Sequence, residues 1–282
     1  MEAFLKTEYP YVFSKFKNLL LKNIKDIDRY RSDIEMVESY LKNCPTCKGI
    51  HECINKYEPG QYCMFRDEED ERFLSLNYAV GFCRHEKARI EQEKINKLLK
   101  TSRISRRFEQ HSLENYNENE HNKAAVVTIK GFIHDFNRDS GNGIMLVGPV
   151  GTGKTHLGVA VLKELIKLGI PGACVTVPEL LNDIRQSYRD NDGNGSKLME
   201  LVKTVQVLML DDLGTEKVSD WVQETLFVII NARYENLLTT IITTNCTPDD
   251  LEKRIGDRSV SRIMEMCKGI LLSGNDYRKR DL

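Results

Sequence analysis

The pattern of hydrophobic and polar positions differs between the two halves of the chain. Residues 9–42 repeat apolar side chains at helical spacing and predict helices. The second half alternates short apolar runs, which predict buried strands, with stretches of helical spacing. This alternation predicts an α/β fold with a parallel sheet. The expected strands are residues 144–147, 173–177, 205–210, 239–244 and 269–273, and the expected helices include residues 121–137, 155–167 and 178–189.

A charged stretch separates the two halves. Residues 86–107 (EKARIEQEKINKLLKTSRISRR) carry many charges and little apolar material, so they offer no broad face to bury in a core. We expect this stretch to be a helix or linker that marks a domain boundary. The expected parts are a small helical N-terminal domain at residues 1–85, a charged linker at residues 86–118 and a C-terminal domain at residues 119–282.

Composition agrees with an intracellular protein of more than one domain. The 282 residues are 40% hydrophobic, which suffices for a buried core. Residues 1–10 contain two glutamates and a lysine, and no run approaches ~18 apolar residues, so we expect no signal peptide and no membrane span. The expected location is the cytoplasm. A net charge of −1 gives no global attraction for nucleic acid, so any DNA contact requires a local patch.

A glycine-rich segment lies where an expected strand meets an expected helix. Residues 148–155 read GPVGTGKT and directly follow the apolar run 144–147. Glycines let backbone N–H groups converge on phosphate oxygens at the positive end of a helix. Lys154 supplies a positive charge for the β- and γ-phosphates, and Thr155 can bind Mg²⁺. The residues expected to bind ATP or ADP are Gly148, Val150, Gly151, Thr152, Gly153, Lys154, Thr155, His156 and Arg278.

Two aspartates and an asparagine follow two further expected strands. The strand at residues 205–210 ends in Asp211 and Asp212, and the strand at residues 239–244 ends in Asn245. We expect Asp211 to bind Mg²⁺ through its water shell, and Asp212 to polarise the attacking water. Asn245 could orient that water or contact the γ-phosphate. Since aspartates also cap helices and asparagines also begin turns, the structural alternatives stay open, but the arrangement predicts a Mg²⁺-dependent ATPase site at the carboxyl ends of the strands.

Two arginines lie four residues apart after the strands that carry these polar residues. Arg258 and Arg262 share one face of an expected helical segment at residues 254–263. A solvated helix face would explain both. In an oligomeric ATPase, however, an arginine offered to the γ-phosphate of a neighbouring subunit stabilises the charge of the transition state. We therefore expect Arg258 to act on a neighbouring subunit.

Five of the eight cysteines lie within 40 residues of the N-terminal half. Cys44 and Cys47 have the C-x₂-C spacing that lets two thiolates bind one tetrahedral ion. A disulfide framework is not expected in a reducing cytosol. The alternatives to a metal site are a cluster of reduced thiols that packs a small core, and a redox-active pair. The favoured Zn²⁺ ligands are Cys44, Cys47, Cys63 and Cys83, with Cys53 or His51 as substitutes.

A basic and aromatic group lies near the end of the helix expected at residues 178–189. Arg185, Tyr188 and Arg189 combine positive charge with an aromatic ring, which can grip a single strand of DNA and stack on a base. A solvated helix face explains these residues equally well. Contact with single-stranded DNA is therefore a hypothesis that rests on three residues.

Taken together, these motifs resemble one branch of the AAA+ ATPases. From about residue 106 to 282, the chain resembles the bacterial replicative-helicase loaders of the DnaI and DnaC type and, more distantly, the IstB-type transposition ATPases. Residues 106–116 resemble the segment that leads into the ATPase core of these loaders. The resemblance implies an AAA+ P-loop fold with a parallel sheet and no full helical lid. The matching motifs are residues 148–155 as Walker A, 207–214 as Walker B, 242–245 as sensor 1, 256–262 as the arginine-finger segment and 276–278 as sensor 2.

The resemblance also implies a function and partners. In such loaders an N-terminal domain holds a DnaB-type replicative helicase hexamer, while the AAA+ domain self-associates, binds single-stranded DNA and turns over ATP. The implied function is ATP-dependent delivery of the replicative helicase onto single-stranded DNA during replication initiation or restart. Asp212 stands where most relatives have glutamate, which favours slow turnover.

A departure from the family pattern concerns the zinc site. DnaI-type loaders carry an N-terminal zinc domain with an early C-x₂-C, a later histidine and a final cysteine. Here residues 57–59 read YEP near the place of that histidine, so Cys63 would have to replace it. Two other function classes stay open: an IstB-type transposition ATPase that coats duplex DNA, which resembles only the ATPase half, and an ATP-switched adaptor that scarcely hydrolyses.

Overall fold

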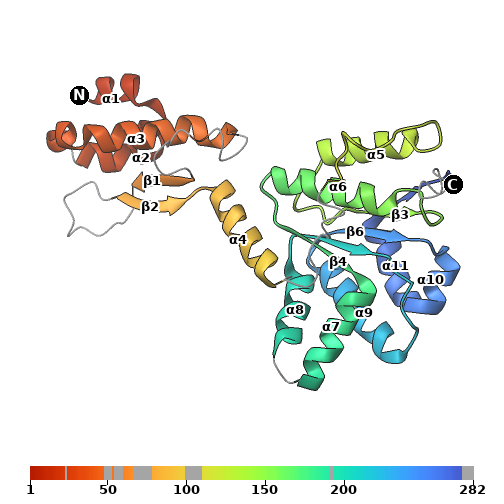
Figure 1. Cartoon of the computed structure of the whole chain (residues 1–282). Helices are drawn as coiled ribbons and strands as arrows, with labels where there is room; N and C mark the ends of the chain where they lie inside the picture. The colour runs from red at the N-terminus through yellow and green to blue at the C-terminus, as the bar shows by residue number, and fades with distance from the viewer. Residues whose placement is uncertain are drawn as a thin grey trace. The chain divides into compact units, whose positions relative to one another are not determined.

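The chain divides into two compact units, an N-terminal unit (Met1–Ile90) and a C-terminal unit (Glu91–Leu282). Figure 1 shows the computed structural model, coloured along the chain. It describes residues 1–22, 24–47, 53, 60–65, 78–98, 110–190 and 193–274.

The N-terminal unit begins with helices that pack around an apolar core. Glu38 on the third helix accepts hydrogen bonds from the backbone N–H groups of Tyr11 (3.1 Å) and Val12 (2.7 Å), so its carboxylate caps the start of the second helix. The core is apolar and includes Leu5, Leu20 and Ile34. The elements are α1 (Glu2–Glu8), α2 (Pro10–Lys22), the 3₁₀ helix η1 (Ile24–Tyr30), α3 (Arg31–Asn43) and the 3₁₀ helix η2 (Cys44–Thr46).

A two-stranded antiparallel sheet and the start of a long helix complete the described part of this unit. Strand β1 (Gln61–Phe65) pairs with β2 (Tyr78–Phe82), with Gln61 opposite Phe82. Helix α4 (Arg84–Leu98) begins two residues after β2 and continues past residue 90 into the C-terminal unit.

The C-terminal unit is built on a five-stranded parallel sheet of order β4-β5-β6-β3-β7. This confirms the α/β fold with a parallel sheet that the sequence predicts. The strands are β3 (Gly143–Val147), β4 (Gly172–Thr176), β5 (Val207–Asp211), β6 (Thr239–Thr244) and β7 (Cys267–Leu271), and the helices are α5 (Lys123–His134), α6 (Lys154–Lys167), α7 (Val177–Asp190), α8 (Asn194–Thr204), α9 (Asp220–Glu235), α10 (Pro248–Ile255) and α11 (Asp257–Met266).

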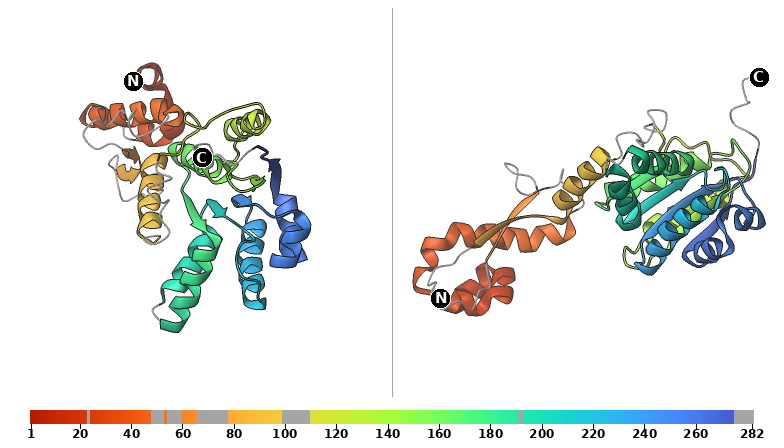
Figure 2. Two further views of the ribbon diagram at one scale, coloured as in Figure 1. Left: turned by 45° about the vertical axis from the view of Figure 1, so that its right-hand side comes forward. Right: turned by 90° about the horizontal axis from the view of Figure 1, so that it is seen from below.

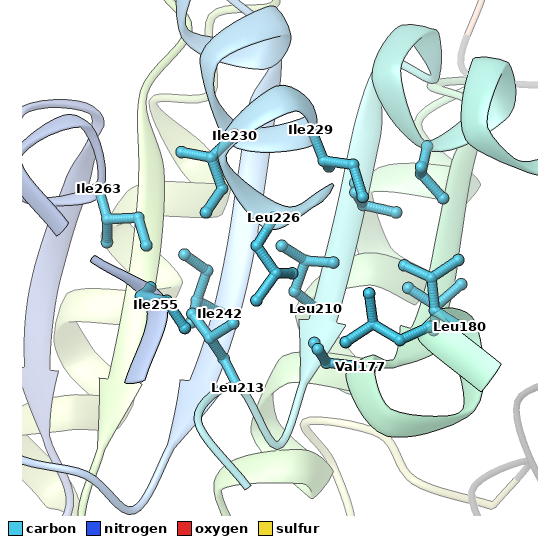
Figure 3. Packing of buried hydrophobic residues seen from close by; sticks show 14 of the residues in the cluster. Val177, Leu180, Leu210, Leu213, Leu226, Ile229, Ile230, Ile242, Ile255 and Ile263 are labelled. Carbon is cyan, nitrogen blue, oxygen red and sulfur yellow. The ribbon is translucent and has the colours of Figure 1, made fainter. Parts of the chain in front are cut away.

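Helices cover both faces of this sheet (Figures 1 and 2). Alternate residues of a strand point to opposite faces, so Ile144 joins the core beneath α5 and α6, whereas Met145 joins the core beneath α7 to α11. Figure 3 shows the second of these cores, where Leu210 of β5 and Ile242 of β6 pack against Leu226 of α9. Because both faces are buried there, the central strands β3, β5 and β6 are mostly apolar or β-branched.

The later half of α4 docks on the edge strand β4. The side-chain amide of Gln92 donates to the carbonyl oxygen of Gly172 (2.8 Å) and accepts from its N–H (2.9 Å). Ile95, one turn further along α4, is buried in the core of the C-terminal unit. These two contacts anchor this half of α4 to the sheet.

A buried arginine connects α9 to the start of two strands. The Arg233 side chain is only 1% exposed, and burial lowers its pKa to about 9. Its guanidinium donates hydrogen bonds of 2.6–3.0 Å to neutral acceptors: the carbonyl oxygens of Val202, Val205 and Thr239 and the hydroxyl of Thr240. One side chain therefore satisfies backbone groups from the α8–β5 connection and from β6.

Replacement of Arg233 by methionine should destabilise the C-terminal unit by about 3 kcal/mol, because four buried acceptors lose their donor. Urea unfolding followed by the fluorescence of Trp221, the one tryptophan of the sequence, measures this unit. Arg138→Met is the matched control, since Arg138 is exposed and its guanidinium bonds to the side chain of Gln206, and it should change stability by less than about 0.5 kcal/mol. Equal unfolding midpoints for both variants would contradict the role of Arg233.

Candidate nucleotide-binding site

The phosphate loop at residues 148–153 connects β3 to α6. Gly151 (φ 83°) and Gly153 (φ 87°) adopt the left-handed conformation that residues with a side chain rarely take. A Cβ atom at Gly148 would lie 2.1 Å from the carbonyl oxygen of Leu272, so this position also requires glycine. The sequence context that predicts the loop, a buried strand before it and a helix after it, is confirmed.

Lys154 begins α6 with its ammonium group held at the loop. Its Nζ atom donates to the carbonyl oxygens of Gly148 and Pro149, both at 2.8 Å. The buried Thr152 hydroxyl donates to the same Pro149 oxygen at 2.9 Å. The side chains of Thr152 and Lys154 thus hydrogen-bond to the loop backbone and hold the positive charge of Lys154 in place.

Asp211 at the end of β5 meets Thr155 of the loop helix. Its Oδ1 atom accepts hydrogen bonds from the hydroxyls of Thr155 (3.0 Å) and Thr243 (2.6 Å). Burial raises the pKa of Asp211, and the hydrogen bond from Thr243 opposes this shift. The two oxygen-bearing residues expected to bind Mg²⁺ are therefore brought together, and Thr243, which the sequence analysis did not identify, orients one of them.

Asp212 and Asn245 lie exposed at the same edge of the sheet. Asp212 has φ 57°, and its N–H donates to the Thr243 hydroxyl (2.9 Å). Asn245 directly follows β6, which lies between β5 and β3 in the sheet. The strand order thus brings the predicted water-orienting residues to the edge that carries the phosphate loop.

Glu216 is a second buried carboxylate near the site that the sequence analysis missed. Its two oxygens accept from the N–H of Gly214 at 3.0 and 3.2 Å, which closes the turn after Asp212. Burial raises the pKa of Glu216, and the charge of Arg254 on α10 partly offsets this. Because Glu216 lies five residues past the end of β5 and outside any apolar pattern, periodicity gives no signal for it.

The two predicted arginines of α11 have different surroundings. Arg258 is exposed, and its guanidinium lies 4.2 Å from the ring centroid of Phe227 on α9. Arg262 is half-buried, stacks on Tyr234 at 4.6 Å and donates to the side-chain oxygen of Asn231 (2.7 Å). Arg262 is thus held by two contacts within its own chain. Arg278 lies outside the described residues.

His156 faces the segment that precedes α5. Its ring stacks on that of His111 with centroids 4.0 Å apart, and its Nε2 atom lies 3.0 Å from both the Ser112 carbonyl oxygen and the Asn115 side-chain oxygen. Burial lowers the pKa of His156 and favours the neutral ring. A contact between His156 and a nucleotide stays a prediction.

Four cysteines of the N-terminal unit, Cys44, Cys47, Cys53 and Cys83, lie near one another. Gly60 donates its N–H to the Cys53 sulfur (3.3 Å) and accepts at its carbonyl oxygen from the N–H of Cys83 (2.6 Å). Arg84 donates to the carbonyl oxygen of Cys47 (2.9 Å). The pKa of Cys44 is raised to about 11 by burial and by the nearby thiol groups of Cys47, Cys53 and Cys83.

This arrangement bears on the predicted zinc ligands. Within the described part of the chain, no three His, Cys, Asp or Glu side chains stand in a geometry that would hold an ion. The side chain of Cys63 and all of His51 lie outside the described residues. The zinc site therefore stays a prediction. Cys53, which the sequence suggests only as a substitute ligand, lies near Cys44 together with Cys47 and Cys83.

The predicted DNA-contact residues lie on α7. Tyr188 is 58% exposed, and Arg189 is exposed beside it. Arg185 stacks on Trp221 of α9, with its guanidinium 4.5 Å from the ring centroid. Tyr188 and Arg189 are therefore accessible to a ligand.

No helix in the described part of the chain is long and apolar enough to cross a membrane.

Comparisons with known proteins connect this site to one family. The profile of the family described as IstB-like ATP binding protein matches residues 67–282. The replicative helicase loader DnaI of Bacillus subtilis is 25% identical over 293 residues, which cover 99% of this chain and 89% of DnaI. A crystal structure of the DnaC helicase loader superposes with a TM-score of 0.56 at 36% identity and covers 60% of this chain and 100% of that one. A crystal structure of DnaI gives a TM-score of 0.55 at 27% identity over 61% of this chain and 96% of that one.

Proposed function

This chain belongs to the family of IstB-like ATP binding proteins, and from that premise we propose that it is an ATP-dependent loader of a replicative DNA helicase. In this proposal a DnaB-type helicase hexamer is delivered onto single-stranded DNA in the cytoplasm during replication initiation or restart. The observation that carries the proposal is that the similarity to DnaI runs over 99% of the chain, so it includes the N-terminal unit as well as the ATPase unit.

The residues of the site fit ATP and Mg²⁺. Gly148 leaves no room for a side chain, Gly151 and Gly153 turn the loop, and Lys154 supplies the charge that a β- or γ-phosphate requires. Thr155 and Asp211, whose oxygens are 3.0 Å apart, form an oxygen donor set suited to Mg²⁺. Mg²⁺, when bound, neutralises charge on the phosphate oxygens.

Hydrolysis needs a water molecule that is polarised and correctly oriented. Asp212 would polarise this water, and Asn245 would orient it. Both side chains are exposed at the carboxyl edge of the sheet, where a water could reach them. Asp212 is shorter by one methylene than the glutamate of most relatives, so its carboxylate reaches less far from the backbone. We therefore infer slow turnover.

Self-association would complete the site through Arg258. This side chain is exposed and stacks on Phe227, so it can leave that ring to meet a phosphate of a neighbouring subunit. Arg262 is less suited, because it is already bonded to Asn231 within its own chain.

The N-terminal unit would hold the helicase, with a zinc ion as its structural support. Cys44, Cys47, Cys53 and Cys83 lie near one another, and the backbone N–H groups of Gly60 and Glu86 donate to the sulfurs of Cys53 (3.3 Å) and Cys83 (3.5 Å). This supports a cysteine site in which Cys53 competes with Cys63 for the fourth ligand position. On α7, Tyr188 and Arg189 are the proposed contacts for single-stranded DNA.

Lys154→Ala should weaken binding of an ATP analogue about a hundredfold, because a charged donor to phosphate is lost. It should also abolish loading, measured as helicase retained on circular single-stranded DNA after gel filtration with the helicase of the same organism. Capture of helicase in solution should persist, since the proposal assigns it to the other unit. Lys167→Ala is the matched control, because Lys167 ends the same helix and pairs with Glu164 at the surface.

Three outcomes separate the function classes. Loading by Lys154→Ala equal to that of the unmodified chain would contradict the role of the loop. ATP-dependent coating of duplex DNA without helicase capture would favour an IstB-type transposition ATPase. Helicase capture that responds to ATP without measurable hydrolysis would favour a switched adaptor.

Arg258→Ala should lower ATP hydrolysis by about 10³-fold and leave ATP binding by the monomer unchanged. Mixing it with Lys154→Ala should restore part of the activity, because the second chain supplies Arg258 to the intact loop of the first. Arg262→Ala serves as the comparison and should keep hydrolysis. Failure of every mixture, together with loss of hydrolysis in Arg262→Ala, would assign the role to Arg262.

The full-length chain should purify with one zinc ion, measured by elemental analysis, because four cysteine thiolates that close around one ion would hold this metal. Cys44→Ser and Cys47→Ser should lose the zinc and the capture of helicase but keep ATP binding. Cys174→Ser, in the C-terminal unit, is the control and should keep both. Comparing Cys53→Ser with Cys63→Ser identifies the remaining ligand, and a chain that contains no zinc would overturn this part of the proposal.

A further inference from the structure

The segment at residues 110–122 packs along the phosphate-loop helix. His111 accepts a hydrogen bond at its carbonyl oxygen from Lys163 (2.9 Å), and Ser112 lies beside His156. Nearer to the loop, the Tyr116 ring lies edge-on to His156, with centroids 5.2 Å apart. From His111 to Tyr116 the segment thus follows α6 over about two turns and reaches the loop itself.

Tyr116 touches the loop at its last two residues before the helix. Its hydroxyl lies 3.4 Å from the carbonyl oxygen of Thr152. Its ring lies against Gly153 so closely that a Cβ atom there would be 2.9 Å from the ring. The ring therefore fills the outer side of the turn that leads into α6.

A neighbouring amide fixes the direction of the Tyr116 hydroxyl. Asn122 is 1% exposed, and its Nδ2 atom donates to the Tyr116 oxygen (3.4 Å) and to the carbonyl oxygen of Asn117 (2.9 Å). Its own oxygen accepts from the N–H of Asn119 (2.8 Å). With its oxygen accepting from Asn122, the hydroxyl has its proton available for Thr152.

The contact of the Tyr116 hydroxyl with the Thr152 carbonyl oxygen determines how the peptide between Thr152 and Gly153 is oriented. In a trans peptide the C=O and the following N–H point in opposite directions. A hydroxyl that holds the Thr152 oxygen on the outer side therefore turns the Gly153 N–H toward the inner side of the loop. That N–H is one of the donors that a phosphate-binding loop presents to its ligand.

We propose that Tyr116 is a positioning residue for the phosphate loop, which it holds in the form that binds a diphosphate or triphosphate group. This rests on the proposed binding of ATP. Binding and local order then become linked: a phosphate that needs the ordered loop also stabilises the packing of residues 110–122 on α6. Nucleotide occupancy is thereby communicated to residues 110–122.

Tyr116→Phe tests this in the full-length chain, because it removes the hydroxyl and keeps the ring that packs on Gly153. The affinities for ADP, by calorimetry, and for pyrophosphate, by competition with ADP, should both fall about fivefold. The ¹⁵N–¹H resonance of Gly153 in glycine-labelled protein should move upfield. Tyr234→Phe is the matched control, since it loses a hydroxyl bonded to the exposed Glu265 and should change neither affinity nor resonance.

Each alternative gives a distinct result. Unchanged affinities in Tyr116→Phe would overturn the proposal. Weaker binding of ADP with unchanged binding of pyrophosphate would also overturn it, because Tyr116 would then contact the nucleoside and not position the loop. If the unmodified chain bound neither ligand, the proposed ATP binding itself would fail, and the role of Tyr116 with it.

Discussion

Burial of both faces of the parallel sheet is the constraint on which the C-terminal unit depends. Helices cover each face, so polar groups within the strands must be satisfied locally, and catalytic chemistry can only emerge where strands end. The carboxyl ends of β3, β5 and β6 therefore carry the residues of the proposed site. Because β6 lies between the other two, Asn245 shares an edge with the phosphate loop and Asp211.

The threonines of β6 show how the buried strand meets this constraint. The hydroxyl of Thr243 donates to Asp211 and accepts from the N–H of Asp212, and the hydroxyl of Thr244 donates to the carbonyl oxygen of Leu213. A strand of valines and isoleucines would pack as well, but it would remove these partners of the Asp212 N–H and the Leu213 carbonyl oxygen and leave Asp211 with the Thr155 hydroxyl alone of its two hydroxyl donors. The same threonines thus satisfy the sheet interior and orient the carboxylates at its edge.

The parts of the site that could be predicted from the sequence are those whose functional residues are consecutive in the chain or directly follow a strand. The phosphate-binding motif at residues 148–155 occupies eight consecutive residues, and Asp211 directly follows an apolar run, so local pattern was sufficient for both. Strand order depends on how the crossovers pack, so Thr243 could not be predicted from the sequence as the partner of Asp211. Tyr116 was missed as a loop contact because it lies more than 30 residues before the loop and reaches it only in the folded chain.

The limits of sequence reasoning were different in the N-terminal unit. Spacing indicated that Cys44 and Cys47 belong together, but five cysteines within 40 residues allow several ligand sets. Which cysteines form the ligand set depends on which of them the folded chain brings close to Cys44 and Cys47. The structure puts Cys53 beside Gly60, which bonds to the backbone of Cys83, and this neighbourhood follows from a glycine turn with φ 87° that periodicity does not register.

The pairing of Gln92 with Gly172 has a consequence for behaviour in solution. Strand β4 lies at one end of the sheet, where outward-facing N–H and C=O groups would otherwise template another strand. The Gln92 amide occupies one such donor and acceptor pair, and Ile95 covers the adjoining apolar surface. The docked half of α4 therefore protects this edge from pairing with strands of other molecules. A C-terminal fragment that begins after residue 98 would lack this cover, and its exposed β4 edge would favour aggregation.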